Sequence, residues 1–103
     1  MKLLHDYAQI FNAMADEFRL KILLYLYVNN ERCVCDIGSF FDVGQSSISY
    51  HLKILCDADI IAKRQVAVWN YYSLNQDSDV YALLKDIFKN IDAKEWMDNA
   101  SNG

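Results

Sequence analysis

Two short amphipathic segments, separated by only three residues, place the tightest limit on how this chain can fold. The first covers about residues 36–41, and the turn DVG follows it. The second, QSSISYHLKILCDA, has Ile48, Leu52 and Leu55 at positions i, i+4 and i+7, so its apolar side chains form one stripe on a helix. Two short helices joined by so short a turn predict a helix-turn-helix.

The second helix of this pair presents a polar outer face. A helix-turn-helix reads DNA from the N-terminal half of its second helix, where side chains reach base edges and phosphates. Spacing alone fits the solvated face of an ordinary helical domain equally well, and for His51 local packing is an alternative to a DNA contact. The candidate DNA-binding residues on this face are Gln45, Ser46, Ser47, Ser49, Tyr50 and His51.

After Asp59 the pattern changes to IIAKRQVAVWNYYSL, which is dense in β-branched and aromatic residues. Such a segment predicts two short strands with a turn near residues 65–68, and this hairpin would form a wing beside the helix-turn-helix. No glycine marks its tip. We expect Trp69, Tyr71 and Tyr72 to pack in the core and the wing rather than to stack on bases.

The net charge of -4 counts against a nucleic-acid partner, because Lys and Arg supply much of the affinity for phosphate. The distribution of charge matters more than its sum. Acidic residues gather toward the C-terminal end of the chain, whereas several basic residues lie in its middle, so a basic face can form on an acidic protein. The phosphate contacts expected there are Lys53, Lys63 and Arg64, with Gln65 extending the contact of the wing.

Three further helices complete the expected fold. Apolar residues at three-and-four spacing predict one helix over residues 3–15 and another that begins after the N-cap Asp16 and stops at an Asn-Asn pair. The same spacing predicts a last helix over residues 77–97, with Asp77 or Ser78 as its cap. The expected fold class is therefore mainly α (α+β): a winged helix-turn-helix with about five helices and a two-stranded β-hairpin wing.

The length of 103 residues fits a single domain that covers residues 1–103. A chain this short buries a limited share of its surface and often gains stability by pairing with a second copy, so we expect oligomerisation. No apolar run approaches the roughly 18 residues of a membrane span. An uneven count of three cysteines without an N-terminal signal pattern favours a reducing compartment, and we expect the cytoplasm.

Two of the cysteines, Cys33 and Cys35, stand one residue apart in the stretch ERCVCDIG. A disulfide between them is not expected, because closing so small a ring strains the bond. Thiolates are soft ligands, so the pair favours As(III), Sb(III), Cd(II), Pb(II), Zn(II) or Cu(I) over hard cations. In a regular helix, side chains at i and i+2 diverge by about 200 degrees, so binding one ion with both sulfurs requires a non-helical start.

Several groups could supply the third ligand of such an ion. It could come from Cys56 near the end of the second helix of the pair, from solvent or a small thiol, or from a partner subunit. Cys56 also fits a partly buried small hydrophobe, and an inert core role is the alternative for the other two cysteines. Two exposed thiols in a charged loop argue against that alternative. The histidines, His5 and His51, are isolated and are weak ligand candidates.

Four segments resemble, in order, the ArsR/SmtB family of winged-helix repressors, and together they cover roughly residues 8 to 75. They are FNAMADEFRLKILLYL, ERCVCDI, QSSISYHLKIL and DADIIAKRQVAVWNYYSL. The resemblance implies a homodimer that sits on operator DNA and leaves it when a metal or metalloid ion binds. It also implies dimer contacts from the first and last helices, and arsenic or antimony thiolate ligands in CVCD.

The chain departs from the family pattern at several positions. Glu17 and Asp59 stand where the family usually has proline and glycine, and the wing sequence QVAV lacks a glycine. The segment MKLLHDYAQ has no cysteine, unlike cadmium- and lead-sensing relatives, and Gly38 occupies the position where arsenic sensors often have a third thiol. As(III) or Sb(III) leads because trivalent arsenic is compact and strongly thiophilic, and the absent third thiol leaves Cd(II), Pb(II) and Zn(II) open.

The expected function is a transcriptional repressor that releases double-stranded operator DNA when a thiophilic ion binds. A thiol-redox regulator, in which Cys33 or Cys35 pairs with Cys56 or with a second subunit, is an alternative. A thiol-disulfide enzyme is disfavoured, because no βαβ pattern precedes the motif and the chain has no proline. A protein-interaction module without an operator is a more distant alternative, which the acidity and the poor wing keep open.

Overall fold

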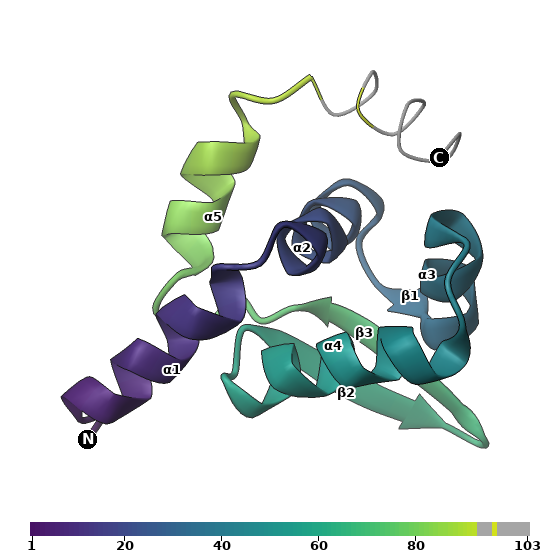
Figure 1. Cartoon of the computed structure of the whole chain (residues 1–103), viewed down its shortest axis with the longest axis horizontal. Helices are drawn as coiled ribbons and strands as arrows, with labels where there is room; N and C mark the ends of the chain where they lie inside the picture. Colours follow the sequence, from purple (N-terminus) through teal and green to yellow (C-terminus); the bar gives the residue numbers. More distant parts are fainter. Residues whose placement is uncertain (93–95, 97–103) are drawn as a thin grey trace.

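The computed structural model describes residues 1–92 and residue 96, over which the chain forms five α-helices and a three-stranded antiparallel sheet (Figure 1). The helix count and the hairpin expected from the sequence are therefore confirmed. No helix of this described part is both long and apolar enough to cross a membrane. The elements, in chain order, are α1 (Leu4–Met14), α2 (Glu17–Asn29), β1 (Arg32–Cys33), α3 (Val34–Phe41), α4 (Gln45–Asp57), β2 (Ile61–Val66), β3 (Trp69–Leu74) and α5 (Tyr81–Phe88).

The helix α2 forms the centre of the fold. Five consecutive residues, 22–26, are buried, which means that other elements surround the helix on nearly every side. Figure 1 shows α1 and α5 on one side of it and α3 on the other. The expected cap is confirmed, since the Asp16 side chain accepts a hydrogen bond from the Arg19 backbone N–H at 2.9 Å. At the other end Asn30 takes a positive φ of 63°, and the helix stops there.

The helices α3 and α4 form the expected helix-turn-helix. Asp42 takes a left-handed conformation with a φ of 54°, and its N–H bonds back to the Ser39 carbonyl at 3.3 Å. Asp is among the few non-glycine residues that adopt this conformation readily, so the turn needs no glycine at that position. The apolar stripe of α4 faces inward as predicted, and its buried members are Ile48, Leu52 and Leu55.

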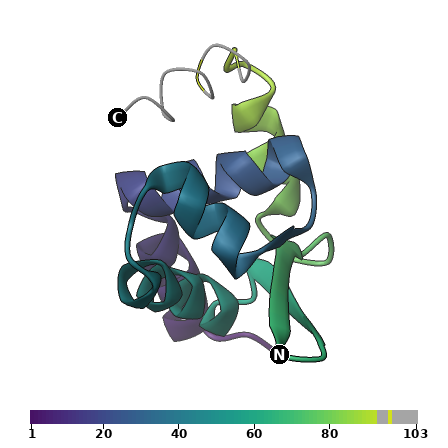
Figure 2. The same ribbon diagram turned by 90° about the vertical axis from the view of Figure 1, so that its right-hand side faces the viewer.

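The strands β2 and β3 form the expected hairpin, with a two-residue turn at positions 67 and 68. Ala67 takes a positive φ of 55°, a conformation that such turns usually give to Gly or Asn. The turn therefore forms without the residue that would have marked it in the sequence. Figure 2 shows the hairpin lying along one side of the layer of helices.

A third strand, β1, goes beyond the two-stranded hairpin expected from the sequence. Arg32 pairs with Tyr72 and Cys33 pairs with Tyr71, so the sheet has the order β1-β3-β2. The inner strand of the hairpin is thus hydrogen-bonded on both edges. The residues that carry the first thiol and the residues of the wing consequently belong to one sheet.

The last helix is shorter than predicted and begins later. It covers Tyr81–Phe88, and its N-cap is Val80, so the expected cap at Asp77 or Ser78 is wrong. Helical bonding stops because the Asn90 side chain, at 2.9 Å, takes the Asp86 carbonyl that the next backbone N–H of a continuing helix would bond. Of the remainder of the predicted segment, positions 93–95 and 97 lie outside the described residues.

The outer faces of α1 and α5 remain apolar. Residues on the inner side of these helices, such as Ile10 and Leu84, are buried against the core. Their outward neighbours are large hydrophobic side chains in contact with solvent. The exposed set includes Leu4, Tyr7 and Phe11 on α1 and Leu83, Ile87 and Ile91 on or near α5.

An aromatic cluster joins α2 to α3. The ring of Tyr25 in α2 lies 4.7 Å from that of Phe40 and 5.8 Å from that of Phe41. Trp96 packs on the same pair, with ring centroids at 6.2 and 6.4 Å. Aromatic pairs at such separations add to the stability gained from burial, so this cluster helps to hold α3 on α2.

Candidate functional site

The two neighbouring thiols meet at the point where β1 ends and α3 begins. Cys33 is extended, with φ -68° and ψ 150°, and its sulfur caps α3 by accepting a hydrogen bond from the Cys35 N–H at 3.3 Å. The two sulfurs are joined as a disulfide, with the Cα atoms 5.4 Å apart. The expectation that these cysteines would not form a disulfide is therefore wrong. This Cα separation lies within the range that disulfides span.

The same change of backbone conformation satisfies the condition for binding one ion through both sulfurs. Because α3 starts only at Val34, the two side chains do not diverge as they would within a regular helix. Their environments differ, however. Cys33 is buried with 6% of its surface exposed, whereas Cys35 is exposed, so the expectation of two exposed thiols holds only for Cys35. In its reduced form, the pair offers a soft ion two sulfurs on one side of the chain.

Cys56 does not join this pair. It lies half-buried near the end of α4, and burial raises the pKa of its thiol. Within residues 1–92 and 96, no three side chains of His, Cys, Asp or Glu are grouped closely enough to hold a metal ion. In this conformation, Cys56 therefore does not complete a three-thiolate site with Cys33 and Cys35 in one subunit.

A cleft of about 390 Å³ opens beside the thiol pair, between α3 and the tip of the hairpin. Cys35 and Gly38 line it from α3, Gln45 from the start of α4, and Trp69 from the hairpin. The cleft thus places an exposed thiol next to the first residue of the candidate DNA-reading helix. Its remaining lining residues are Val34, Ser39, Asp42, Val43, Ile48, Val68 and Asn70.

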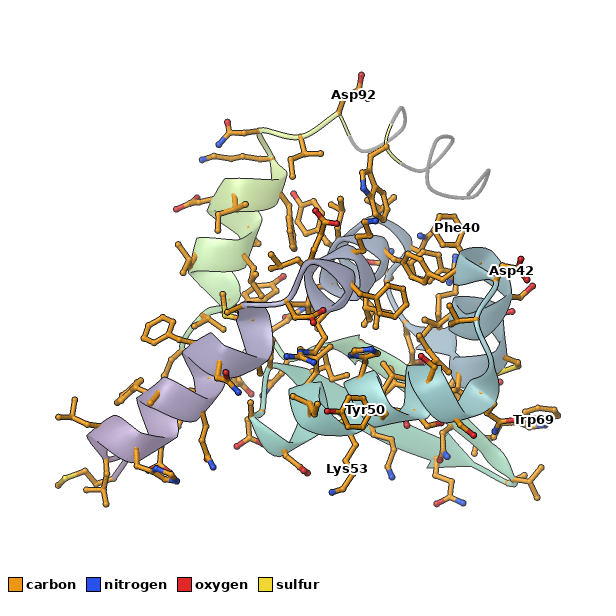
Figure 3. All side chains as sticks on the ribbon, viewed as in Figure 1. Phe40, Asp42, Tyr50, Lys53, Trp69 and Asp92 are labelled. Atoms are coloured by element: carbon orange, nitrogen blue, oxygen red, sulfur yellow. A yellow bond between two sulfur atoms is a disulfide. The ribbon has the colours of Figure 1, made fainter. Side chains whose placement is uncertain are left out.

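The outer face of α4 is as polar and exposed as the sequence indicates. Figure 3 shows Tyr50 and Lys53 projecting from it, and Tyr50 has 63% of its surface exposed. His51 differs, because its ring packs 5.0 Å from that of Phe18 and its Nδ1 lies 3.2 Å from a guanidinium nitrogen of Arg19. The structure therefore shows the packing role for His51. The other exposed candidates on this face are Gln45, Ser46, Ser47 and Ser49.

The residues expected to contact phosphate differ in how far other groups of the protein already bind them. Lys53 forms an ion pair with Asp57 at 3.0 Å within α4, and Lys63 is exposed on β2. Arg64 is held by Glu31, a partner that the sequence did not reveal. Gln65 is exposed, and its amide donates to the Ala67 carbonyl at 3.3 Å across the turn.

The hairpin aromatics fall into two groups. Tyr72 is buried, and Tyr71 is half-buried beneath the guanidinium group of Arg64, whose central carbon lies 5.4 Å from the ring centroid. These two therefore pack as predicted. Trp69 has 52% of its surface exposed and extends outward near the hairpin tip, so the packing role expected for it is wrong (Figure 3). It stands at the start of β3, where it lines the cleft beside α3 without being buried.

Comparison with known proteins places this geometry in a family. The model of the bacterial regulatory protein arsR family matches residues 16–63, which include β1, α3, α4 and the start of β2. The arsenical resistance operon repressor of Bacillus subtilis is 47% identical over 85 residues, which cover 82% of this chain and 80% of that protein. The chain belongs to the ArsR family.

Further relatives of this ArsR-family protein are also regulators rather than enzymes. The cadmium resistance regulatory protein CadC homolog of Staphylococcus aureus is 34% identical and shares 81% of this chain and 68% of its own length. Among solved structures, HlyU from Vibrio cholerae superposes with a TM-score of 0.73 at 29% identity, covering 82% of this chain and 90% of that one. A homodimeric winged helix-turn-helix domain from Mycobacterium bovis also gives 0.73, at 26% identity, over 82% and 76%. The protein is thus a winged helix-turn-helix transcriptional regulator.

Proposed function

We propose that this ArsR-family protein is a homodimeric repressor that binds operator DNA through α4 and the hairpin wing and releases it when a thiophilic ion binds Cys33 and Cys35. As(III) or Sb(III) is the favoured ion, and Cd(II), Pb(II) and Zn(II) are the alternatives. The observation that carries the proposal is the adjacency of the two sulfurs at the start of α3. The names of the relatives support it, since they include arsenical and cadmium resistance regulators.

The thiol pair suits this chemistry because each sulfur binds as a thiolate. With arsenous acid, two As–OH groups leave as water while two As–S bonds form and the thiols give up their protons. One hydroxyl stays on the arsenic, so a third thiol is not required. This balance matches a site in which two cysteines stand together and Cys56 stands apart.

The route from the ion to DNA runs through elements that the thiols share with the reading surface. Cys33 ends β1, which pairs with the wing strand β3, and Cys35 lies in α3, which a three-residue turn joins to α4. An ion that changes the backbone at this junction acts on both parts at once. A 100-fold loss of DNA affinity needs a coupling of about 2.7 kcal/mol, which lies within the usual range of allosteric coupling.

The homodimer is supported by the apolar side chains on the outer faces of α1 and α5. Leu4 has 88% of its surface exposed and Phe11 has 56%, which is costly for an isolated subunit in water. Two copies of α4 and two wings also fit a DNA site built from two half-sites, because dimer symmetry repeats in the DNA. The structural neighbour from Mycobacterium bovis is itself described as homodimeric.

The decisive experiment is an anaerobic titration of the fully reduced protein with As(III) and, separately, with Cd(II), following sulfur-to-ion absorption. We expect saturable absorption that disappears in Cys33→Ser and persists in Cys56→Ser, the matched control. The same samples are then mixed with labelled DNA from upstream of the protein's own gene, and the ion should release the protein. Absorption without release would reject the repressor role, and absence of absorption with both ions would reject the sensor.

A redox-responsive regulator is a second candidate, and the disulfide between Cys33 and Cys35 favours it. Two thiols lose two electrons and two protons to an oxidant such as a small disulfide, and the bond closes within the motif rather than to Cys56. Oxidised protein should then lose DNA in the absence of any ion. Mass spectrometry after blocking of free thiols identifies which cysteines pair, and unchanged DNA binding by the oxidised protein would exclude this candidate.

A further inference from the structure

The wing carries one arginine, Arg64, whose guanidinium group is bound by a carboxylate of the same chain. The Arg64 guanidinium group donates two hydrogen bonds to the Glu31 carboxylate, from Nε at 2.9 Å and from Nη2 at 2.6 Å. The group also lies over the ring of Tyr71, with 5.4 Å between its central carbon and the ring centroid. A forked pair of this kind fixes the direction of the guanidinium as well as its charge. Arg64 is therefore oriented by Glu31 before any phosphate approaches.

The ion pair lies on the sheet that also carries the first thiol. Tyr71 stands opposite Cys33 on one side and opposite Arg64 on the other, so these three residues form one row across the strands. Glu31 immediately precedes β1, two residues before Cys33. The carboxylate that holds the wing arginine is thus part of the segment that bears the thiol pair.

The pair is open to exchange because it lies in solvent. The Arg64 side chain is 60% exposed and the Glu31 side chain is 35% exposed. Exposed ion pairs contribute little to stability, and a DNA phosphate offers the same guanidinium an equivalent forked acceptor. The Glu31 carboxylate and a phosphate would therefore contend for the same guanidinium N–H groups, those of Nε and Nη2.

We propose that Glu31 is a positioning residue that competes with DNA phosphate for Arg64 and thereby limits the affinity of the wing. This inference rests on the proposed DNA-binding function. It assigns Glu31 a role opposite to that of a residue that merely holds the wing in shape. If Glu31 competes, its loss strengthens DNA binding; if it only supports the wing, its loss weakens binding.

The test uses the reduced, ion-free protein and a fluorescein-labelled duplex of random sequence at low salt, because phosphate contacts do not depend on sequence. Glu31→Gln should tighten binding by about threefold per wing, hence about tenfold for a dimer that uses both wings. The plot of log affinity against log salt should steepen by about 0.9 per subunit, the value for one more phosphate contact. Asp77→Asn removes the same charge at an exposed position in the β3–α5 loop and should change neither quantity.

A second pair of variants separates competition from a general effect of charge. In an Arg64→Gln background, Glu31→Gln should give no gain, because the freed arginine is missing. Arg64→Lys should bind DNA at least as tightly as the unaltered protein, since lysine keeps the charge but cannot form the forked pair with Glu31. Circular dichroism melts of all variants check that the fold is retained, and the exposed Lys variant provides the test if a Gln variant melts early.

Several outcomes would overturn the inference while leaving the proposed function standing. These are weaker or equal DNA binding by Glu31→Gln, an equal gain in Asp77→Asn, or an equal gain in the Arg64→Gln background. In contrast, failure of the unaltered protein to bind both random-sequence and upstream DNA at low salt would overturn the proposed function and, with it, this inference.

Discussion

The thiols at the start of α3 and the thiol near the end of α4 occupy contrasting surroundings in the same small fold. Cys33 and Cys35 stand where a strand changes into a helix, and their sulfurs meet. Cys56 stands inside regular helix, half-buried, with its pKa raised by burial. The difference teaches that backbone geometry, more than the number of cysteines, decides which sulfurs can act together on one ion.

The largest effect expected from this contrast is on ion affinity. Cys33→Ser or Cys35→Ser should reduce the affinity for As(III) by at least about 100-fold, because the one remaining thiolate cannot form a chelate with the ion. Cys56→Ser should leave affinity within about twofold, since Cys56 stands apart from the pair. Competition with a dithiol chelator measures all three. A comparable loss in Cys56→Ser would break the contrast and indicate a site shared between subunits.

A third thiol placed on the α3 side should sharpen the contrast. Gly38 follows Cys35 by one helical turn, and both line the same cleft. A Cβ added there would meet the Val43 carbonyl oxygen at 3.6 Å and Ile48 at 3.8 Å, which is ordinary contact, so the backbone at position 38 has room for the Cβ of Gly38→Cys. The affinity for As(III) should rise by about tenfold or more, as a third As–S bond replaces the remaining hydroxyl.

The matched control for this gain in As(III) affinity adds a thiol beside Cys56 instead, near the end of α4. Asp57→Cys places it beside Cys56 on an exposed position of α4 and should leave the affinity for As(III) unchanged. Arsenic K-edge X-ray absorption counts the sulfur neighbours directly, with two expected in the unaltered protein and three in Gly38→Cys. A count that stays at two would show that position 38 does not reach the ion.

A smaller effect concerns the rate at which the reduced thiols react with iodoacetamide. The thiolate is the reactive form, and the raised pKa of Cys56 reduces its thiolate fraction at neutral pH. Cys56 should therefore react at least about fivefold more slowly than exposed Cys35 at pH 7.5, and its rate should still be rising where an ordinary thiol has levelled off. Peptide mass spectrometry after timed labelling gives each rate. Equal rates at pH 7.5 would show that Cys56 and Cys35 do not differ in thiol reactivity.

Much of the fold follows from local pattern. The spacing of Ile48, Leu52 and Leu55 placed α4 correctly, and Asp16 marked the start of α2. The C-terminal limit of the last helix escaped the sequence because the Asn90 side chain competes for a backbone carbonyl, and such competition is not visible in apolar periodicity. Local pattern thus finds elements and their buried faces more reliably than their ends.

The parts of the site that the sequence missed depend on partners far away along the chain. β1 has two residues, too few for a pattern, and it exists because Cys33 meets Tyr71. Glu31 and Arg64 are separated by 33 positions, so the sequence around one residue gives no indication of its contact with the other. The burial of Cys33 likewise comes from elements folded around it, whereas the motif itself was readable.

The two tryptophans give the protein its own optical readout. Trp69 lines the cleft beside Cys35, and Trp96 packs against Phe40 and Phe41 on the same helix, α3. An ion at the thiol pair therefore sits close to one emitter, while a shift of α3 changes the surroundings of the other. Replacing each tryptophan by phenylalanine separates the two signals. Occupancy of the site and movement of the helix then become two label-free signals, each recorded in real time on its own single-tryptophan variant.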